Sequence, residues 1–188
     1  DEVLKAMSDT QTPQGILALA KQYHYGLKDL LSQSGAAHFI VLERLQDPGN
    51  LGTILRAGEA AGITGVIMDS QTADIYNPKV IRSTMGAVFR VPFVYVEDLK
   101  AALLQLKDHG VHLYAAHLKG QNPYDQEDYT ESTGFLIGNE AQGLSDEIAS
   151  LADTYVKIPM AGSVESLNAA IASSVLMFEV ARQRRNQK

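Results

Sequence analysis

Short runs of apolar residues that alternate with longer helical patterns constrain the fold of this chain more than any other feature. The runs lie at residues 38–42, 65–68, 91–96, 111–116, 134–138 and 155–158. Their lengths suit β-strands, and they are apolar throughout rather than at every second position. Strands of this kind are buried on both faces, which is typical of parallel sheets. The sequence therefore predicts an α/β fold, with a mostly parallel sheet and helices on both faces.

Helical patterns fill most of the intervals between these runs. They span residues 51–61, 78–85, 96–109, 145–151 and 166–185. The last pattern places on one helix face the residues Leu167, Ala170, Ile171, Ser174, Val175 and Phe178. That spacing indicates an amphipathic helix.

Residues 1–36 differ in character from the rest of the chain. A break at Thr12-Pro13-Gln14-Gly15 and a polar stretch at Gln33-Ser34-Gly35 precede the first apolar run. We interpret residues 1–36 as an N-terminal extension or linker, and residues 37–188 as a single domain long enough to bury a sizeable core. Because the chain begins at Asp1 rather than at a methionine, we expect it to be a piece of a longer protein with a domain upstream.

Composition excludes several classes of protein. A net charge of −6 and a pI of about 5.3 argue against a protein that coats nucleic acid through its overall charge, so any such contact must be local. Basic residues concentrate only near the C-terminus, at Arg182, Arg184, Arg185 and Lys188. The absence of cysteine leaves no disulfide framework and fits a cytoplasmic protein. No apolar stretch has the length of a bilayer span, so no membrane partner is expected.

Several common functional motifs are missing. The chain has no G-x-G-x-x-G, no G-x-x-x-x-G-K-[ST] and no G-x-S-x-G, which disfavours dinucleotide enzymes, P-loop enzymes and serine hydrolases. The five histidines show no spacing typical of metal ligands, so we expect no metal. A small-molecule α/β enzyme that uses a nucleotide cofactor is therefore an unfavoured alternative.

The first segment with unusual chemistry follows the first apolar run, at residues 42–56. Asp47-Pro48-Gly49-Asn50 forms a turn, and Asn50 is placed to cap the helix that follows. Arg56 lies nearly two helical turns further on. These two residues have a purely structural interpretation, as a cap and as a solvent-facing side chain, and a functional one in a ligand site.

Two further segments join a strand to a helix, at the sheet edge where open α/β sheets bind ligands. In the first, an apolar run leads into Gly138-Asn139-Glu140, a tight loop in which the Glu140 carboxylate could orient a base or a substrate group. In the second, Ser166 and Asn168 stand at the start of the final helix, either as caps or as hydrogen-bond donors to a ligand. The apolar Ile158, Met160 and Leu167 could line an adenine-sized slot beside them.

Together the three segments resemble the motifs of the SpoU/TrmH family of the SPOUT superfamily, whose members methylate ribose 2′-hydroxyls of rRNA or tRNA. The matching motifs are N-L-G-T-I-L-R-A-G-E-A-A-G at residues 50–62, I-G-N-E-A-Q-G-L at 137–144 and I-P-M-x-G-S-V-x-S-L-N-A-A-x-A at 158–172. The resemblance spans most of residues 38–185. It implies a SPOUT-type α/β fold with a deep trefoil knot in the C-terminal half, and a homodimer whose active sites use both chains.

The resemblance also implies roles for individual residues. The expected catalytic residues are Asn50, Arg56, Glu140, Ser166 and Asn168. The expected contacts to S-adenosylmethionine come from Ile137, Gly138, Asn139, Ile158, Met160 and Leu167. Because a guanidinium stays protonated in proteins, we expect Arg56 to stabilise the developing alkoxide or a nearby phosphate, with Glu140 and Asn50 fixing its geometry.

The expected function is the S-adenosylmethionine-dependent methylation of a ribose 2′-hydroxyl in structured RNA, with 23S rRNA favoured over tRNA. Residues 7–20 look like the join that follows an L30e-like RNA-binding domain in longer family members, and that domain is not in this sequence. A catalytically inactive RNA-binding paralogue is the alternative from a different class. Intact Arg56, Glu140 and Asn168 argue against it.

Overall fold

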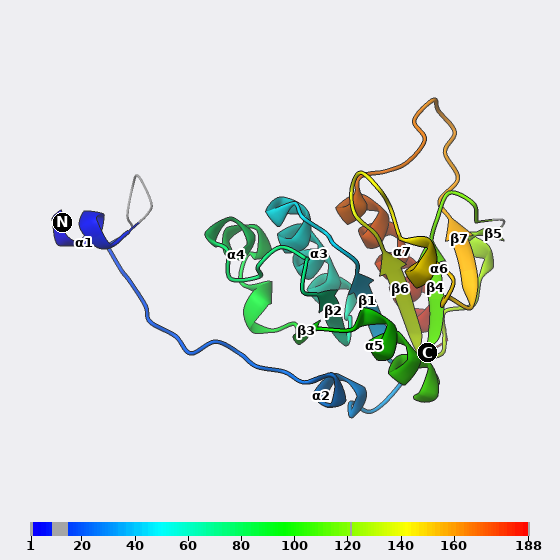
Figure 1. Cartoon of the computed structure of the whole chain (residues 1–188), viewed down its shortest axis with the longest axis horizontal. Helices are drawn as coiled ribbons and strands as arrows, with labels where there is room; N and C mark the ends of the chain where they lie inside the picture. The colour runs from blue at the N-terminus through cyan, green and yellow to red at the C-terminus, as the bar shows by residue number, and fades with distance from the viewer. Residues whose placement is uncertain (1, 9–14, 121, 188) are drawn as a thin grey trace.

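The computed structural model describes residues 2–8, 15–120 and 122–187, and its centre is a seven-stranded sheet (Figure 1). The strand order is β3-β2-β1-β6-β4-β7-β5, and all neighbouring strands run parallel. The strands are β1 (His38–Leu42), β2 (Gly65–Asp69), β3 (Phe93–Val96), β4 (His112–Ala116), β5 (Asn122–Pro123), β6 (Thr133–Ile137) and β7 (Thr154–Lys157). The predicted parallel α/β sheet is confirmed.

The predicted strands match these elements to within two residues at either end, and β1 has the predicted bounds. The two-residue strand β5 was not predicted, because two residues carry no periodicity. The third strand begins later than expected, at Phe93. Pro92 precedes it and cannot donate a ladder hydrogen bond, although its carbonyl accepts one from the backbone N–H of Val66.

The helices other than α1 cover both faces of the sheet, as predicted. They are α1 (Glu2–Met7), α2 (Leu27–Leu31), α3 (Pro48–Ala61), α4 (Pro78–Thr84), α5 (Leu99–Asp108), α6 (Asp146–Ala149) and α7 (Ala169–Arg185), with 3₁₀ turns η1 (Ala87–Phe89) and η2 (Tyr124–Gln126). Buried residues of α3, α4, η1 and α7 form one core layer. Those of α2, α5 and α6 form the other.

Three helices start elsewhere than predicted, because aspartate or asparagine side chains cap them. Asp47 caps α3 by accepting a hydrogen bond from the backbone N–H of Asn50, and Pro48 follows at the first helical position. The prediction that Asn50 is the cap is therefore wrong. Asp98 caps α5 and Asn168 caps α7, which makes both helices shorter than the patterns suggested.

The long C-terminal helix α7 buries a different face from the one that the pattern picked out. Its buried positions include Ser173, Leu176, Met177 and Val180. Ile171 and Phe178 are about half exposed, at 49% and 47%. Among the described helices, α7 included, none is both long enough and apolar enough to cross a bilayer.

Hydrogen bonds from Arg184 hold the end of α7 against the residues that precede β1. Its guanidinium donates hydrogen bonds to the backbone carbonyls of Ala36, Ala37, Tyr129 and Glu131. Arg182 pairs with Glu179 of the same helix. Of the basic residues noted near the C-terminus, these two are thus engaged within the molecule, and Lys188 lies outside the described residues.

Within the segment predicted as an extension, the described residues before Tyr23 lie apart from the sheet, whereas α2 at its end packs Leu30 into the core. Residues 15–24 are exposed, and α1 lies far from the sheet in Figure 1. The predicted break at residues 12–14 lies outside the described residues. Contact with the domain begins at Tyr23, whose backbone N–H donates to the Tyr76 hydroxyl, and at Tyr25, whose ring packs edge-on against Phe93.

His38, the first residue of β1, is a buried titratable group in the core. Its ring packs edge-on against Phe135, and its Nε2 atom has no hydrogen-bond partner among the described residues. Burial, together with the positive charge of Arg184, lowers the pKa of His38 to about 3. In the unfolded chain His38 binds a proton as the pH falls below about 6.5, whereas in the native state it stays neutral until about pH 3. The free energy of unfolding therefore decreases as the pH drops below 6.5.

We therefore expect the free energy of unfolding to decrease by about 2 kcal/mol between pH 7.5 and pH 5 through His38 alone. The His38→Phe variant, which cannot titrate, should show a pH dependence weaker by that amount in urea denaturation. His24→Phe, at an exposed site, is the matched control. An unchanged pH dependence in His38→Phe would contradict this assignment.

Candidate active site

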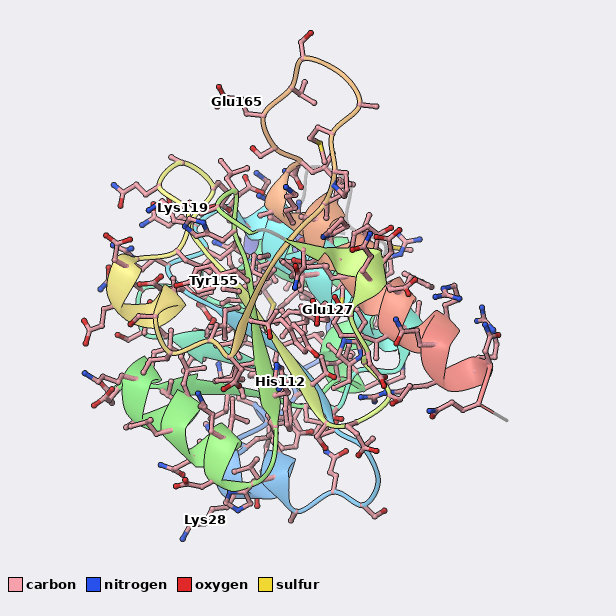
Figure 2. The ribbon with its side chains drawn as sticks, turned by 90° about the vertical axis from the view of Figure 1, so that its right-hand side faces the viewer. Lys28, His112, Lys119, Glu127, Tyr155 and Glu165 are labelled. Carbon is pink, nitrogen blue, oxygen red and sulfur yellow. The ribbon has the colours of Figure 1, made fainter. Side chains whose placement is uncertain are left out.

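The loops that carry the predicted site residues meet at the carboxyl-terminal edge of the sheet. Three segments converge there: residues 43–50 after β1, 138–145 after β6 and 158–168 after β7. A cavity of about 630 Å³ opens between the last two segments and the start of α7. The 158–168 loop stands out from the sheet edge in Figure 1, and Figure 2 shows Glu165 in it, at the opposite end of the molecule from Lys28.

Glu140 anchors the first loop to the second. Its carboxylate accepts hydrogen bonds from the backbone N–H groups of Gln46 and Asp47, at 3.1 and 2.9 Å, and from the Asn50 side-chain amide at 3.0 Å. Burial raises the pKa of Glu140, but the hydrogen bonds from Asn50, Asp47 and Gln46 outweigh it and leave the pKa below its ordinary value. Glu140 is therefore ionised at neutral pH and acts as a hydrogen-bond acceptor.

Asn50 connects Glu140 to the start of the final helix. Because Asp47 caps α3, the Asn50 side chain is free to bridge the loops. Its Oδ1 atom accepts a hydrogen bond of 2.9 Å from the Asn168 side-chain amide. Asn168 in turn accepts the backbone N–H groups of Ala170 and Ile171 as the cap of α7. Three predicted residues from distant parts of the sequence thus form one hydrogen-bonded chain.

The loop after β6 folds tightly upon itself at Gly138. A Cβ atom at this position would lie 2.1 Å from the backbone carbon of Gly143 and 2.1 Å from the nitrogen of Leu144. Asn139 and Gly143 exchange two backbone hydrogen bonds, which close the loop. Only glycine fits at position 138 without moving the loop backbone.

The cavity wall contains every predicted cofactor contact. Among the residues that line it are Ile137, Gly138, Asn139, Ile158, Met160 and Leu167, together with Glu140, Ser166 and Asn168. The wall also includes side chains that the sequence interpretation missed, such as His117 and Lys157. They follow or end strands at the same sheet edge, which is the signal that could have found them.

Arg56 stands apart from this cluster. It is exposed on α3 and does not line the cavity. No hydrogen bond or ion pair joins its side chain to Glu140, Asn50 or any other residue that the structure describes. The expectation that Glu140 and Asn50 fix the geometry of Arg56 is therefore not met within this chain.

The described residues do not include a group of three or more histidine, aspartate or glutamate side chains able to hold a metal ion.

Known proteins share both this sequence and this fold. The SpoU rRNA Methylase family model matches residues 37–178. A putative TrmH family tRNA/rRNA methyltransferase of Staphylococcus aureus (strain MSSA476) is 35% identical over 176 residues, which cover 91% of this chain and 71% of the relative. The 23S rRNA (guanosine(2553)-2′-O)-methyltransferase RlmP of Bacillus subtilis (strain 168) is 33% identical over 180 residues, or 96% of this chain and 70% of the relative.

Two solved structures contain the cofactor. The SpoU methyltransferase AviRb from Streptomyces viridochromogenes, in complex with AdoMet, has a TM-score of 0.78 and 34% identity, covering 84% of this chain and 61% of its own. An AdoMet-bound rRNA methyltransferase from Sinorhizobium meliloti has a TM-score of 0.79 and 36% identity, covering 86% and 62%. This chain thus spans less than two thirds of each solved chain. From its sequence, its fold and its site, the chain belongs to the SpoU/TrmH family of RNA methyltransferases.

Proposed function

We propose that this S-adenosylmethionine-dependent RNA methyltransferase acts on a ribose 2′-hydroxyl of structured RNA, with 23S rRNA as the favoured substrate and tRNA as the alternative. The observation that carries the proposal is the hydrogen-bonded chain Glu140–Asn50–Asn168, in which Glu140 and Asn168 line the cavity. The Bacillus relative, named for 2′-O-methylation of 23S rRNA, supports the choice of substrate.

The cavity fits the cofactor in size and chemistry. Its volume of about 630 Å³ lies within the range of small-molecule sites. Ile158, Met160 and Leu167 offer apolar surface for an adenine, and the loop around Gly138 brings backbone polar groups to the wall. S-adenosylmethionine would supply a methyl carbon attached to a sulfonium sulfur. Ser166 and Asn168 would shape the side of the pocket that the ribose enters.

The residues of this chain align and stabilise the reaction rather than supply a strong base. Methyl transfer would require the ribose 2′-oxygen to be held in line with the carbon–sulfur bond of the bound cofactor, and the hydroxyl proton would pass to solvent water. Glu140 is a poor base, because its carboxylate is already occupied by three donors and its pKa is lowered. Its role is to position Asn50 and the start of α3. The protonated Arg56 would stabilise the negative charge that develops on the ribose oxygen or on a nearby phosphate.

We propose that Arg56 performs this role across a homodimer interface. Arg56 lies outside the cavity of its own chain, so we infer that Arg56 of one subunit reaches the cavity of the other. Ile171 and Phe178 form an exposed apolar stripe on α7, and α7 packs against α3, which carries Arg56. An apolar stripe of this kind is typical of a surface that a second copy covers.

A basic surface beside Arg56 supports contact with RNA. Residues 75–96 contain three basic side chains and no acidic one, although the whole chain is acidic. Two residues of α3 contact this segment: Gly52 lies against Ser83, and Glu59 pairs with Arg90. Because Arg56 lies between Gly52 and Glu59 on the same helix, it lies alongside residues 83–90. Lys79 and Arg82 are exposed, and neither side chain is engaged by a described residue. These two cations can bind phosphates.

Replacing Lys79 and Arg82 with alanine should weaken RNA binding and leave cofactor binding unchanged. For each phosphate that the variant no longer binds, the slope of log K against log salt concentration should decrease by about 0.7 to 0.9. The control is the Lys28→Ala/Lys100→Ala variant, which removes the same charge from the opposite face of the sheet. Equal RNA affinity and equal salt slopes in the two variants would contradict the basic surface.

The proposal extends to three features of the whole protein. The family match, and the gathering of residues 138–145, residues 158–168 and the start of α7 around one cavity, support a C-terminal trefoil knot. The exposed residues 15–24 support a join to an RNA-binding domain. We also propose a cytoplasmic location, which a ribosomal RNA substrate would support.

Methyl transfer from radiolabelled S-adenosylmethionine, followed by mapping of the labelled nucleotide, tests the function directly. We expect label on a ribose 2′-oxygen of 23S rRNA. Label on tRNA would support the alternative substrate. Cofactor binding with no transfer to either RNA would favour an inactive RNA-binding paralogue, and the proposed activity would be wrong.

A further inference from the structure

Arg44, at the exit of the first strand, holds a backbone conformation that non-glycine residues rarely adopt. Its φ angle is 53°, and in the described part of the chain only one other non-glycine residue, Met85, has a positive φ. An L-residue in this left-handed region is disfavoured because Cβ approaches the carbonyl oxygen. Neighbouring groups must therefore hold residue 44 in place.

Asp69, at the end of β2, holds the backbone of Arg44. Both of its carboxylate oxygens accept the Arg44 N–H at 3.1 Å, and the hydroxyl of Thr72 donates to Oδ1 at 2.8 Å. Hydrogen bonds to an ionised acceptor are among the stronger ones in proteins. Asp69 lies outside the cavity and takes no part in the reaction described above.

On its other side, Arg44 holds the loop that lines the cavity. Its carbonyl accepts a hydrogen bond of 2.8 Å from the Asn139 side-chain amide. The Oδ1 atom of Asn139 then accepts the N–H groups of Ala141 and Gln142, at 2.9 and 3.1 Å. Asn139, Ala141 and Gln142 all belong to the cavity wall. Hydrogen bonds thus run without a gap from Asp69 to the wall.

The Arg44 side chain does not explain the conformation of its own backbone. Its guanidinium makes only a long ion pair with Glu43, at 3.4 Å, and its buried Nε atom has no hydrogen-bond partner among the described residues. The conformation at residue 44 is therefore set by the contacts of the main chain, of which Asp69 supplies the charged one.

We propose that Asp69 is a positioning residue of the methyltransferase site. It keeps residue 44 in the left-handed conformation, so that the carbonyl of residue 44 faces Asn139 and the loop at 139–143 keeps the shape of the cofactor pocket. The inference rests on the proposed function in one respect, namely that this cavity binds S-adenosylmethionine.

A rescue experiment separates positioning from general stability. Asp69→Ala should weaken S-adenosylmethionine binding about tenfold, the effect of losing one hydrogen bond to a charged group. Adding Arg44→Gly should restore most of the affinity, because glycine adopts the left-handed conformation without help. Adding Arg44→Ala should not restore the affinity. This substitution removes the same side chain but leaves a Cβ atom, which keeps the left-handed conformation unfavourable. Thr72→Val, which leaves the Asp69–Arg44 contact in place, should bind like the wild type.

Two readouts on the full chain decide the outcome. Calorimetry measures cofactor affinity, and amide hydrogen exchange measures the protection of the Ala141 and Gln142 N–H groups. These groups should exchange faster in Asp69→Ala, and their protection should recover only with glycine at position 44.

Equal affinity and equal protection in the glycine and alanine double variants would overturn the proposal, as would wild-type affinity and protection in Asp69→Ala. If Asp69→Ala does not fold, the same comparison is made in Asp69→Asn. A wild-type chain that fails to bind the cofactor would refute the proposed function, and the exchange data would still test Asp69.

Discussion

Arg56→Ala should reduce kcat for methyl transfer at least about a hundredfold and leave the affinity for S-adenosylmethionine unchanged. The size of the loss is that of removing one preorganised donor to a developing oxyanion. The cofactor affinity should stay the same, because the proposed partner of Arg56 is the ribose oxygen or a phosphate of the RNA and not the cofactor. Single-turnover methylation and calorimetry on the same variant measure the two quantities. A near-wild-type kcat would exclude Arg56 from the reaction.

Mixing two inactive variants tests whether Arg56 acts across the dimer. The partner variant is Leu167→Asp, which places a carboxylate in the cavity wall of a chain that keeps Arg56. If each active site takes its arginine from the other subunit, randomly mixed dimers recover about one quarter of wild-type activity, because half of them are mixed and each mixed dimer has one complete site. An inactive mixture would place Arg56 in its own chain's site instead.

Gly138→Ala should abolish cofactor binding and destabilise the protein by about 3 kcal/mol or more. The added methyl group would overlap the backbone of Gly143 and Leu144, at 2.1 Å, and neither main-chain group can turn away as a side chain would. The loop from Asn139 to Gly143 would have to open, and it forms part of the cavity wall.

Gly162→Ala is the matched control, since Gly162 lies in another loop of the same region and its Cβ would meet no atom within 4 Å. Thermal unfolding and calorimetry with S-adenosylmethionine compare the two variants. Wild-type stability and affinity in Gly138→Ala would show that the loop backbone yields, which would contradict the tight packing described above.

The strands were predictable because each is an uninterrupted apolar run, and such runs have one simple explanation in a buried parallel sheet. The helix starts were harder, because capping depends on which of several adjacent polar residues turns toward the backbone. In the turn before α3 both Asp47 and Asn50 can cap, and Asp47 does so. A proline directly after an aspartate was the signal available in the sequence.

The arrangement of the site could be predicted only in part. The motifs pointed to Glu140, Asn50 and Asn168, and the structure joins these three by hydrogen bonds. No periodicity in the sequence indicates that β6 lies between β1 and β4, which is what brings the loop of Glu140 beside that of Asn50. Arg56 was expected in the same cluster, but it is exposed on α3 and does not line the cavity. The exposed side of α7 was missed because a helix with apolar residues on two sides does not reveal which side packs against the rest of the domain.

The central place of β6 has a consequence for synthesis on the ribosome. His38 of β1 pairs with Thr133 of β6, about 95 residues later, and β4 pairs with the other edge of β6. At a translation rate of about 5 to 20 residues per second, roughly 5 to 20 seconds pass between the synthesis of β1 and that of β6. During that interval the edge of β1 that β6 will fill is open to other chains, and the matching edge of β4 is open from the time β4 is made until β6 follows it. Chaperone protection of the nascent chain should therefore matter most before residue 137 emerges from the ribosome.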